Sequence, residues 1–255
     1  MSERISYWAM IELYRTYLFE DGPFLETIRD AGGQLDAKTL SRIAHSYSVS
    51  RTIPSSPKSD GYNLQILWNE IKDLQKRWPT TLDRRAEECR ISAIRVSASF
   101  QRQEKSEGKG RSPGAPHSAI TKLIWFVEPN GWTVFDALAS NAVLKSGGTA
   151  GERQQRFYRV IAEPFAHWTD NLRKNTGRFE PRLYAERLID KYLLLTGLKP
   201  QGFSEVRTRN CHFLRLLPQP IQERLTQCAL AVANDLPNGA FPKEATSKRS
   251  RERIS

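Results

Sequence analysis

The sequence predicts an all-α protein, and three observations support this prediction. Apolar residues recur at intervals of three and four positions through most of the chain, as they do on one face of an amphipathic helix. The periodic segments are separated by short stretches rich in Gly, Pro and Ser, which interrupt helices. No two segments show the alternating pattern of paired strands, and no repeat of fixed period is present. With 255 residues, of which 39% are hydrophobic, the chain is long enough to bury a substantial core.

The expected helices of the first half have recognisable beginnings or ends. Asp36 can cap the third helix, because an aspartate side chain accepts hydrogen bonds from the first free backbone amides. Gly32 and Gly33 separate this helix from the one before, and a Pro- and Ser-rich loop over 51–61 follows it. Pro79 ends the fourth helix. The expected helices are Ser6–Phe19, Phe24–Ala31, Asp36–Tyr47, Tyr62–Trp78 and Leu82–Gln103.

The second half continues the helical pattern. A basic loop over 105–116 leads to a short helix, an extended segment and a second short helix. Residues 239–255 are polar and basic, which predicts a disordered tail. We therefore expect one all-α domain over 1–238, either undivided or built as two lobes over about 1–104 and 117–238. Its further helices are expected at Ser118–Val127, Asp136–Lys145, Gly151–Lys174, Pro181–Thr196, Phe203–Leu217 and Ile221–Asp235.

The charge of the chain favours a nucleic-acid partner over an acidic protein. The formal net charge is +11, and 26 of the 39 basic residues are arginine. Arginine is frequent where planar, bidentate contact with phosphate is needed. The positive charge comes from the chain after residue 50, since the first 50 residues carry 7 acidic and 5 basic side chains.

Cysteine and histidine usage argues against several kinds of site. The 3 cysteines are widely separated, which argues against a disulfide framework, a zinc ribbon or an iron–sulfur cluster and fits a reducing cytoplasm. The 4 histidines have no metal-ligand spacing. No apolar run is long enough to cross a membrane, and the N-terminus does not resemble a signal peptide. We therefore expect a cytoplasmic protein without a metal, a cofactor or a membrane partner.

Residues 118–136 set a lysine and an aspartate in an otherwise apolar and aromatic run. Ser118 can cap a short helix, which would put Lys122 in or near its first turn. Pro129-Asn130-Gly131 would end that helix, and Asp136 would open the next one. A helix rises about 1.5 Å per residue and an extended chain about 3.3 Å, so the return segment is long enough to bring Asp136 back beside Lys122.

This pair has the composition of a reactive site, because a neutral lysine amine is a nucleophile. Neighbouring aromatics, the positive end of the helix and upstream cations would favour the neutral amine, whereas the aspartate would favour the ammonium. The competing interpretation is that Lys122 is solvated and Asp136 only caps its helix. The spacing alone does not decide between them. The aromatics are Trp125, Phe126, Trp132 and Phe135, and the upstream cations are Lys109 and Arg111.

A motif runs through this segment: Thr121-Lys122, Trp125-Phe126, Pro129 and Val134-Phe135-Asp136. It resembles the nucleophile region of the helical DNA glycosylases of the 8-oxoguanine type, and most closely the compact bacterial proteins with an 8-oxoguanine DNA glycosylase (OGG) fold. Residues 187–197 are similar to a C-terminal helix of these proteins. The resemblance implies two helical lobes with a cleft between them. It also implies that Lys122 attacks the sugar carbon of a damaged nucleoside and that Asp136 assists departure of the base.

A second set of candidates lies over residues 151–175, where basic and aromatic residues are interleaved. Aromatic rings can stack on extruded bases while arginines hold phosphates. The interpretation favoured for any single residue is an amphipathic helix with its aromatics in the core and its arginines in solvent. Asp190 likewise either supports the site or, as we favour, forms a surface ion pair. The nucleic-acid candidates are Lys109, Arg111, Arg153, Arg156, Arg159, Arg173 and Lys174.

From the resemblance and the charge we expect a DNA glycosylase, with or without lyase activity, that acts on a flipped and damaged or modified base. The alternative is a non-catalytic nucleic-acid-binding protein of the same fold, acting with partner proteins in bacterial anti-phage defence. The residues expected to contact the base are Trp125, Phe126, Trp132, Phe135 and His117, which lies five residues before Lys122.

Overall fold

A computed structural model describes residues 4–49, 62–106, 114–177, 179 and 183–236. Within these residues all regular secondary structure is helical, which confirms the all-α prediction. None of the helices described is both long and apolar enough to cross a membrane. The elements are α1 (Ile5–Thr16), the π-helix η1 (Tyr17–Asp21), α2 (Gly22–Asp30), α3 (Ala37–Ser46), α4 (Tyr62–Lys76), α5 (Leu82–Ser106), α6 (His117–Val127), α7 (Ala137–Val143), α8 (Ala150–Thr176), α9 (Ala185–Gly197), α10 (Pro200–Leu216) and α11 (Gln219–Asp235).

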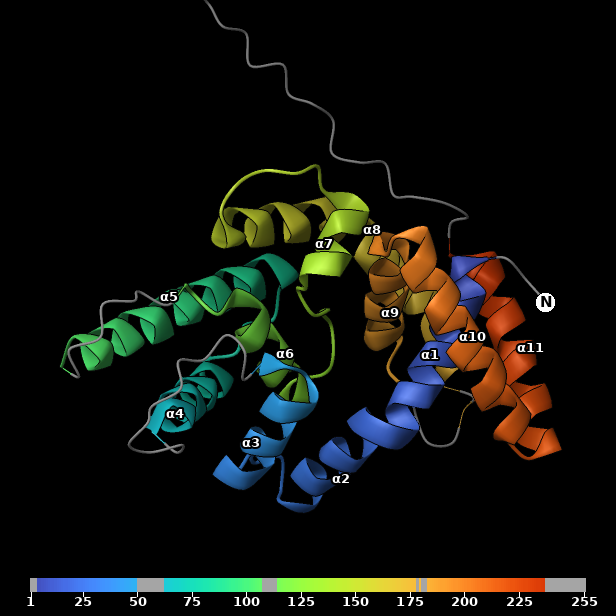
Figure 1. Cartoon of the computed structure of the whole chain (residues 1–255), viewed down its shortest axis with the longest axis horizontal. Coiled ribbons are helices and arrows are strands. Elements are labelled where there is room, and N and C mark those ends of the chain that lie inside the picture. The colour runs from blue at the N-terminus through green and yellow to red at the C-terminus, as the bar shows by residue number, and fades with distance from the viewer. Residues whose placement is uncertain (1–3, 50–61, 107–113, 178, 180–182, 237–255) are drawn as a thin grey trace, which may run out of the picture.

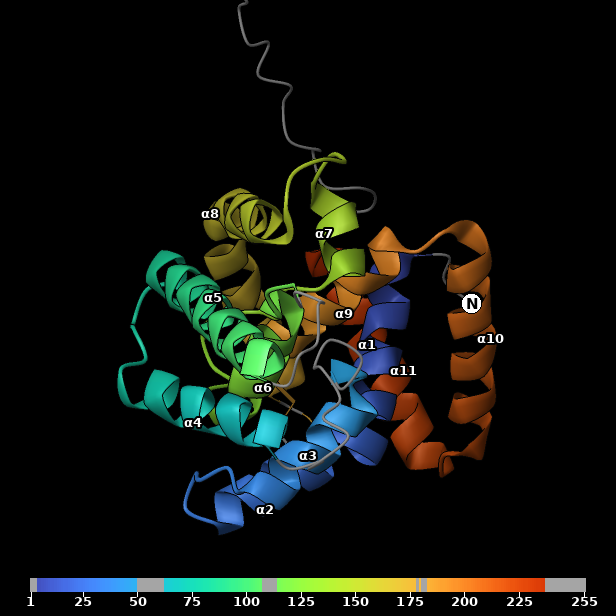
Figure 2. The same cartoon turned by 60° about the vertical axis from the view of Figure 1, so that its left-hand side comes forward.

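The helices form two groups that do not follow their order in the chain (Figure 1). Helices α2 to α6 form one group, while α1 packs with α9, α10 and α11 in the other. Helix α8 joins the groups, because it packs against α5 on one side and against α9 and α11 on the other. Figure 2 shows α1 lying among the C-terminal helices. The two lobes expected over about 1–104 and 117–238 stay a prediction. Helix α6, which belongs to the second range, packs with α4 and α5 of the first.

Helix α9 packs against α1, α7 and α8. Every side chain from Ala185 to Leu193 is buried, including four charged ones. A helix that is covered on all sides normally carries apolar residues throughout. The charged side chains of α9 must therefore find partners inside the protein, because an unpaired buried charge is strongly unfavourable.

A glycine at the end of α9 allows α7 to approach closely. A Cβ atom on Gly197 would overlap the carbonyl oxygen of Leu138 in α7 and would lie 2.7 Å from its carbonyl carbon. Any other residue would push the two helices apart. Since Asp136 immediately precedes α7, this contact helps to fix the position of the aspartate.

Several helix boundaries differ from the predicted ones. Helix α6 begins at His117, after Pro116, so Ser118 is not its cap. Lys122 consequently lies in the second turn, beyond the region where the positive helix end acts most strongly. Helix α7 ends at Val143, before Lys145. Both α10 and α11 begin earlier than their apolar periodicity indicates, with a proline in the first two positions of each. Proline favours this position because it lacks an amide hydrogen that would be unpaired there.

Candidate lysine–aspartate site

Lys122 and Asp136 meet at the start of α7, as the length of the return segment predicts. The Nζ atom of Lys122 lies 3.0 Å from Oδ2 of Asp136, and the two side chains are 21% and 18% exposed. The other carboxylate oxygen of Asp136 accepts a hydrogen bond from the backbone amide of Leu138 at 2.7 Å. Asp136 therefore caps α7 with one oxygen and binds the lysine with the other, in a position that solvent partly reaches.

A buried hydrogen bond connects the two chain segments one residue before each member of the pair. The hydroxyl oxygen of Thr121 lies 3.0 Å from the carbonyl oxygen of Phe135, and Thr121 is fully buried. The same hydroxyl is 3.0 Å from the carbonyl of Ser118 within α6. Because Thr121 precedes Lys122 and Phe135 precedes Asp136, this contact joins the two segments directly beside the ion pair. The motif contains Thr121, but its role across the turn was not predicted.

The turn between the two residues is held by hydrogen bonds from three other helices. Gly131 has a φ of 74°, which residues with a side chain rarely adopt. Buried backbone groups need partners, and here side chains supply them. The turn is therefore fixed from several sides. Glu186 of α9 accepts from the amide of Gly131 at 2.9 Å, Arg85 of α5 donates to the carbonyl of Asn130 at 2.6 Å, and Tyr158 of α8 donates to the carbonyl of Thr133 at 2.7 Å.

The four aromatic residues expected to contact a base all lie in the core. Trp125, Phe126, Trp132 and Phe135 are at most 5% exposed. In this conformation none of the four presents an open face on which a base can stack, so their role in substrate binding stays a prediction. Their edge-on neighbours are Tyr184 for Trp125, Phe24 and Tyr47 for Phe126, Trp78 for Trp132 and Phe157 for Phe135.

His117 begins α6 and packs against α8. It is buried, and its Nδ1 atom lies 2.7 Å from Oε1 of Gln154. Burial lowers the pKa of the imidazole, although the hydrogen bond with Gln154 acts in the opposite direction. The ring also lies close to Gly151, where a Cβ would come within 3.2 Å of it. The described contacts of His117 thus join α6 to the start of α8.

Two arginines predicted to bind nucleic acid are engaged with the chain around α7. Arg153 donates to the hydroxyl of Ser140 at 2.6 Å. Arg156 donates to the carbonyl of Gly147 at 3.1 Å. These contacts hold α7 and the segment that follows it against α8.

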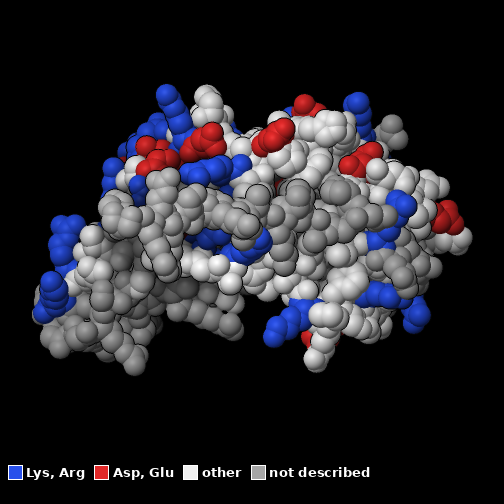
Figure 3. Space-filling model, turned by 90° about the horizontal axis from the view of Figure 1, so that it is seen from above, with Lys and Arg blue, Asp and Glu red and all other residues white. Residues whose placement is uncertain are grey.

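The remaining basic candidates differ in exposure. Arg173 is half exposed and pairs with the buried carboxylate of Glu186 at 2.7 Å, whereas Arg159 and Lys174 are exposed. On the face seen in Figure 3, Lys and Arg side chains occur in several places, with acidic side chains among them along the upper edge. The aromatics interleaved with these cations are buried, as the amphipathic interpretation predicts: Phe157, Tyr158, Phe165 and Trp168. Lys109 and Arg111 lie outside the described residues.

A cluster of buried charges lies on α9. Arg187 binds both carboxylate oxygens of Asp21, at 2.9 Å and 3.2 Å, and one oxygen of Asp190 at 2.7 Å. The prediction that Asp190 forms a surface ion pair is therefore wrong, because Arg187 and Asp190 are 4% and 3% exposed. The apolar residues around them on α9 were a usable signal, since a helix apolar on all sides is a core helix. Asp21, which comes from η1, carries no such signal.

Asp190 links this cluster electrostatically to the lysine–aspartate pair. Burial raises the pKa of the Asp190 carboxyl, while Arg187 and Lys191 oppose the increase. The charges of Asp136 and Lys122 act on the same carboxyl, the first raising its pKa and the second lowering it. The buried cluster and the partly exposed pair therefore lie within electrostatic range of each other.

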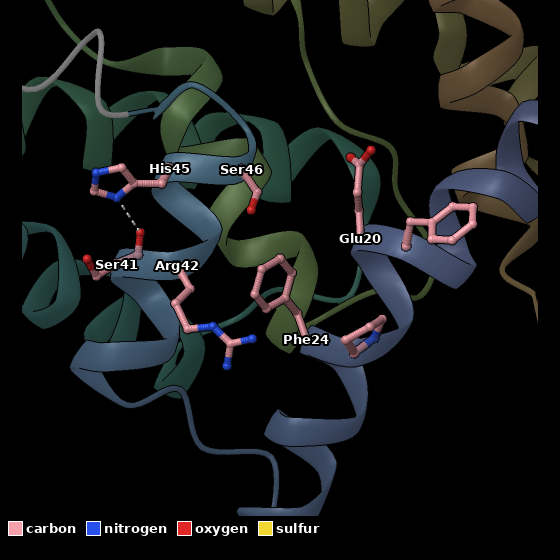
Figure 4. A pocket seen from close by; sticks show the side chains of 8 residues that line it. Glu20, Phe24, Ser41, Arg42, His45 and Ser46 are labelled. Carbon is pink, nitrogen blue, oxygen red and sulfur yellow. Dashed lines mark hydrogen bonds between the residues drawn. The ribbon is translucent and has the colours of Figure 1, made fainter. Parts of the chain in front are cut away.

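Two hollows lie next to η1 and α2. Figure 4 shows one of about 430 Å³ between η1–α2 and α3, with the guanidinium of Arg42 beside the ring of Phe24. A second, of about 620 Å³, is lined by residues that include Tyr17, Phe126 and Tyr184. Lys122 and Asp136 line neither of them. Among the described residues, no group of three or more His, Cys, Asp or Glu side chains is arranged to hold a metal ion.

Comparison of the chain with protein-family models, with curated protein sequences and with solved structures gives no match. The functional assignment therefore depends on the geometry of the lysine–aspartate pair and on the chemistry that its residues allow.

Proposed function

We propose that this protein is a DNA glycosylase that uses Lys122 as its nucleophile and Asp136 as its proton-transfer partner. The observation that carries this proposal is the 3.0 Å separation of the Lys122 amine and the Asp136 carboxylate in a partly exposed position. Direct proton transfer requires heavy atoms about 2.6–3.2 Å apart. The motif around the pair and the excess of arginine support DNA as the substrate.

The reaction would begin with transfer of a proton from the Lys122 ammonium to Asp136, which leaves a neutral amine. The amine nitrogen attacks C1′ of the nucleotide while the bond from C1′ to the base breaks. The base leaves with the bonding electrons and takes up a proton. Cleavage of the C1′–O4′ bond, with a proton delivered to O4′, converts the adduct into a protonated imine. Asp136 is positioned to accept and return protons in these steps.

A second candidate function is nucleic-acid binding without catalysis. It is favoured by the burial of the four aromatic residues of the segment 118–136, because none of these rings is open for stacking. In this function the pair would be a structural contact, with Asp136 acting as the cap of α7. The two functions differ in one measurable respect, because only a nucleophilic lysine forms an imine with DNA.

Borohydride trapping distinguishes the two functions. Borohydride reduces an imine to a stable amine, so the wild-type protein should become covalently attached to DNA that contains an abasic site or an oxidised base. Lys122→Gln should abolish trapping and retain DNA binding, because an amide is not a nucleophile. Lys145→Gln is the matched control, since Lys145 is exposed beyond the end of α7, and it should trap like the wild type.

The partner residue is tested on the same substrates. Asp136→Asn should slow base release about a hundredfold, the usual scale for loss of a positioned acid/base group. It should also cost about 1 kcal/mol of stability through the weakened cap of α7, so the rate must be measured on protein shown to be folded. Unchanged trapping by Lys122→Gln would assign the nucleophile to another residue. Absence of trapping by the wild type across a broad panel of lesions would favour the binding protein.

A further inference from the structure

Arg187 contacts residues from four parts of the chain. Its guanidinium binds Asp21 in η1 through two hydrogen bonds and Asp190 in α9 through a third. The planar fork of an arginine suits this arrangement, because it presents several donors in fixed directions. Its side chain is 5% exposed and that of Asp21 is 1% exposed, so water does not compete for these contacts.

The same guanidinium lies over two aromatic rings of the first helix group. Its central carbon is 4.7 Å from the ring centroid of Trp125 in α6 and 5.5 Å from that of Tyr47, which follows α3. The hydroxyl of Tyr47 also donates to Asp21. Trp125 lies one turn after Lys122 on α6. Arg187 is therefore in contact with the helix that carries the candidate nucleophile.

The hydrogen bond from Arg187 to Asp190 connects the cluster with Asp136, the other member of the pair. Asp190, held by Arg187, lies on α9 within electrostatic range of both Lys122 and Asp136. Helix α9 also packs closely against α7 through Gly197, and Asp136 caps α7. Arg187 thus contacts α6, which carries Lys122, and it lies on α9, which packs against the helix that Asp136 caps.

A buried ion cluster adds little net stability compared with well-packed apolar residues, because the cost of desolvating its charges offsets their attraction. What such a cluster does supply is direction, since each hydrogen bond fixes an angle as well as a distance. We propose that Arg187 is a positioning residue, which holds α6 and α9 in the relative position that keeps the Lys122 amine against the Asp136 carboxylate. The consequence for catalysis rests on the proposed glycosylase function, whereas the geometric claim does not.

The test compares Arg187→Lys with Arg209→Lys. The first keeps the charge but loses the planar fork and its stacking. We expect it to lower the rate of borohydride trapping on abasic DNA by about tenfold or more, since a displacement of about 1 Å can cost a hundredfold in rate. DNA affinity should stay within about twofold of the wild type. Arg209 is half exposed and binds Glu12 at 3.0 Å, so its replacement should leave the trapping rate unchanged.

Each outcome decides the inference. A folded Arg187→Lys protein that traps at the wild-type rate overturns it. If the wild type itself does not trap, the proposed function fails, and a crystal structure of Arg187→Lys decides the geometric claim. A Lys122–Asp136 separation beyond about 4 Å, the usual limit of an ion pair, supports the claim, and an unchanged contact overturns it. If Arg187→Lys does not fold, Asp190→Asn replaces it in both measurements, because it removes the charge that Arg187 holds and keeps the shape.

Discussion

Two sets of paired charges lie next to α6, and they differ in depth. The Lys122–Asp136 pair is about one-fifth exposed, whereas Arg187 and Asp21 are almost completely enclosed. Water partly screens the first pair, so its attraction contributes little to stability. An enclosed pair is not screened, and loss of one member leaves the other charged and unsolvated. This difference in burial fits the proposed catalytic role of the first set and the proposed positioning role of the second.

The two sets also differ in their distance along the chain. Lys122 and Asp136 belong to one helix–turn–helix segment, and the hydrogen bond from Thr121 to Phe135 keeps them together locally. Arg187 and Asp21 are 166 residues apart. The Lys122–Asp136 pair is thus formed within a short segment, whereas the Arg187–Asp21 pair joins helices that are distant in the sequence.

The largest expected effect is on stability, and it directly tests the difference in burial between the two sets of charges. Arg187→Met should lower the free energy of unfolding by about 3–5 kcal/mol, because the buried carboxylates of Asp21 and Asp190 would lose the cation that is hydrogen-bonded to both of them. Lys122→Met should lower it by about 1 kcal/mol or less. Urea unfolding of both variants at neutral pH measures the two values. Equal losses would mean that the two sets do not differ in the way their exposure indicates.

A second variant tests the close packing of α7 against α9 without changing any charge. Gly197→Ala should lower the free energy of unfolding by about 3 kcal/mol, because the added methyl group overlaps the backbone of Leu138. Thermal unfolding measures the loss. The matched control is Gly114→Ala, since a Cβ at Gly114 meets no atom within 4 Å, and it should change stability by less than about 0.5 kcal/mol. A stable Gly197→Ala protein would show that α7 can move away from α9 at little cost.

The smallest expected effect concerns the pH dependence of a buried carboxylate near the same cluster. Burial opposes ionisation of Glu12, but Arg15, Lys191 and Arg209 outweigh it and lower the pKa of its carboxyl below the ordinary value of 4.5. A lowered pKa in the folded state contributes stability above the ordinary pKa, and this stability is lost as the pH falls through the folded-state value.

Glu12→Gln should therefore cost about 2 kcal/mol at pH 7, the scale of a charged hydrogen bond. The difference from the wild type should shrink steadily below about pH 4.5. Urea midpoints measured from pH 7 to pH 3 give this curve, and the exposed Glu205→Gln serves as the control. A difference that stays constant with pH would show that the charge of Glu12 is not what stabilises the fold.

The features that depend on residues close together in the sequence were predictable. Apolar periodicity located the helices, and the length of the segment from Pro129 to Asp136 predicted that the aspartate returns to Lys122. The features that were predicted wrongly or not at all depend on tertiary packing. Asp190 was placed at the surface from its charged neighbours alone, but α9 is enclosed on all sides and buries it. Asp21 could not be paired with Arg187, because nothing near either residue specifies a partner 166 positions away.

The packing of α1 among the last helices has a consequence for biosynthesis. Arg4 donates to the carbonyl of Ala233, a contact that spans 229 residues. The N-terminal end of a chain emerges from the ribosome first, and synthesis proceeds at about 5–20 residues per second. Helix α1 can therefore dock against α9, α10 and α11 only after these helices have been synthesised. In the first part of that interval the segment with Lys122 and Asp136 has emerged, but α9, which carries Arg187, has not. Closing so long a loop is slow, and the surface of α1 that contacts α10 and α11 stays uncovered until those helices emerge.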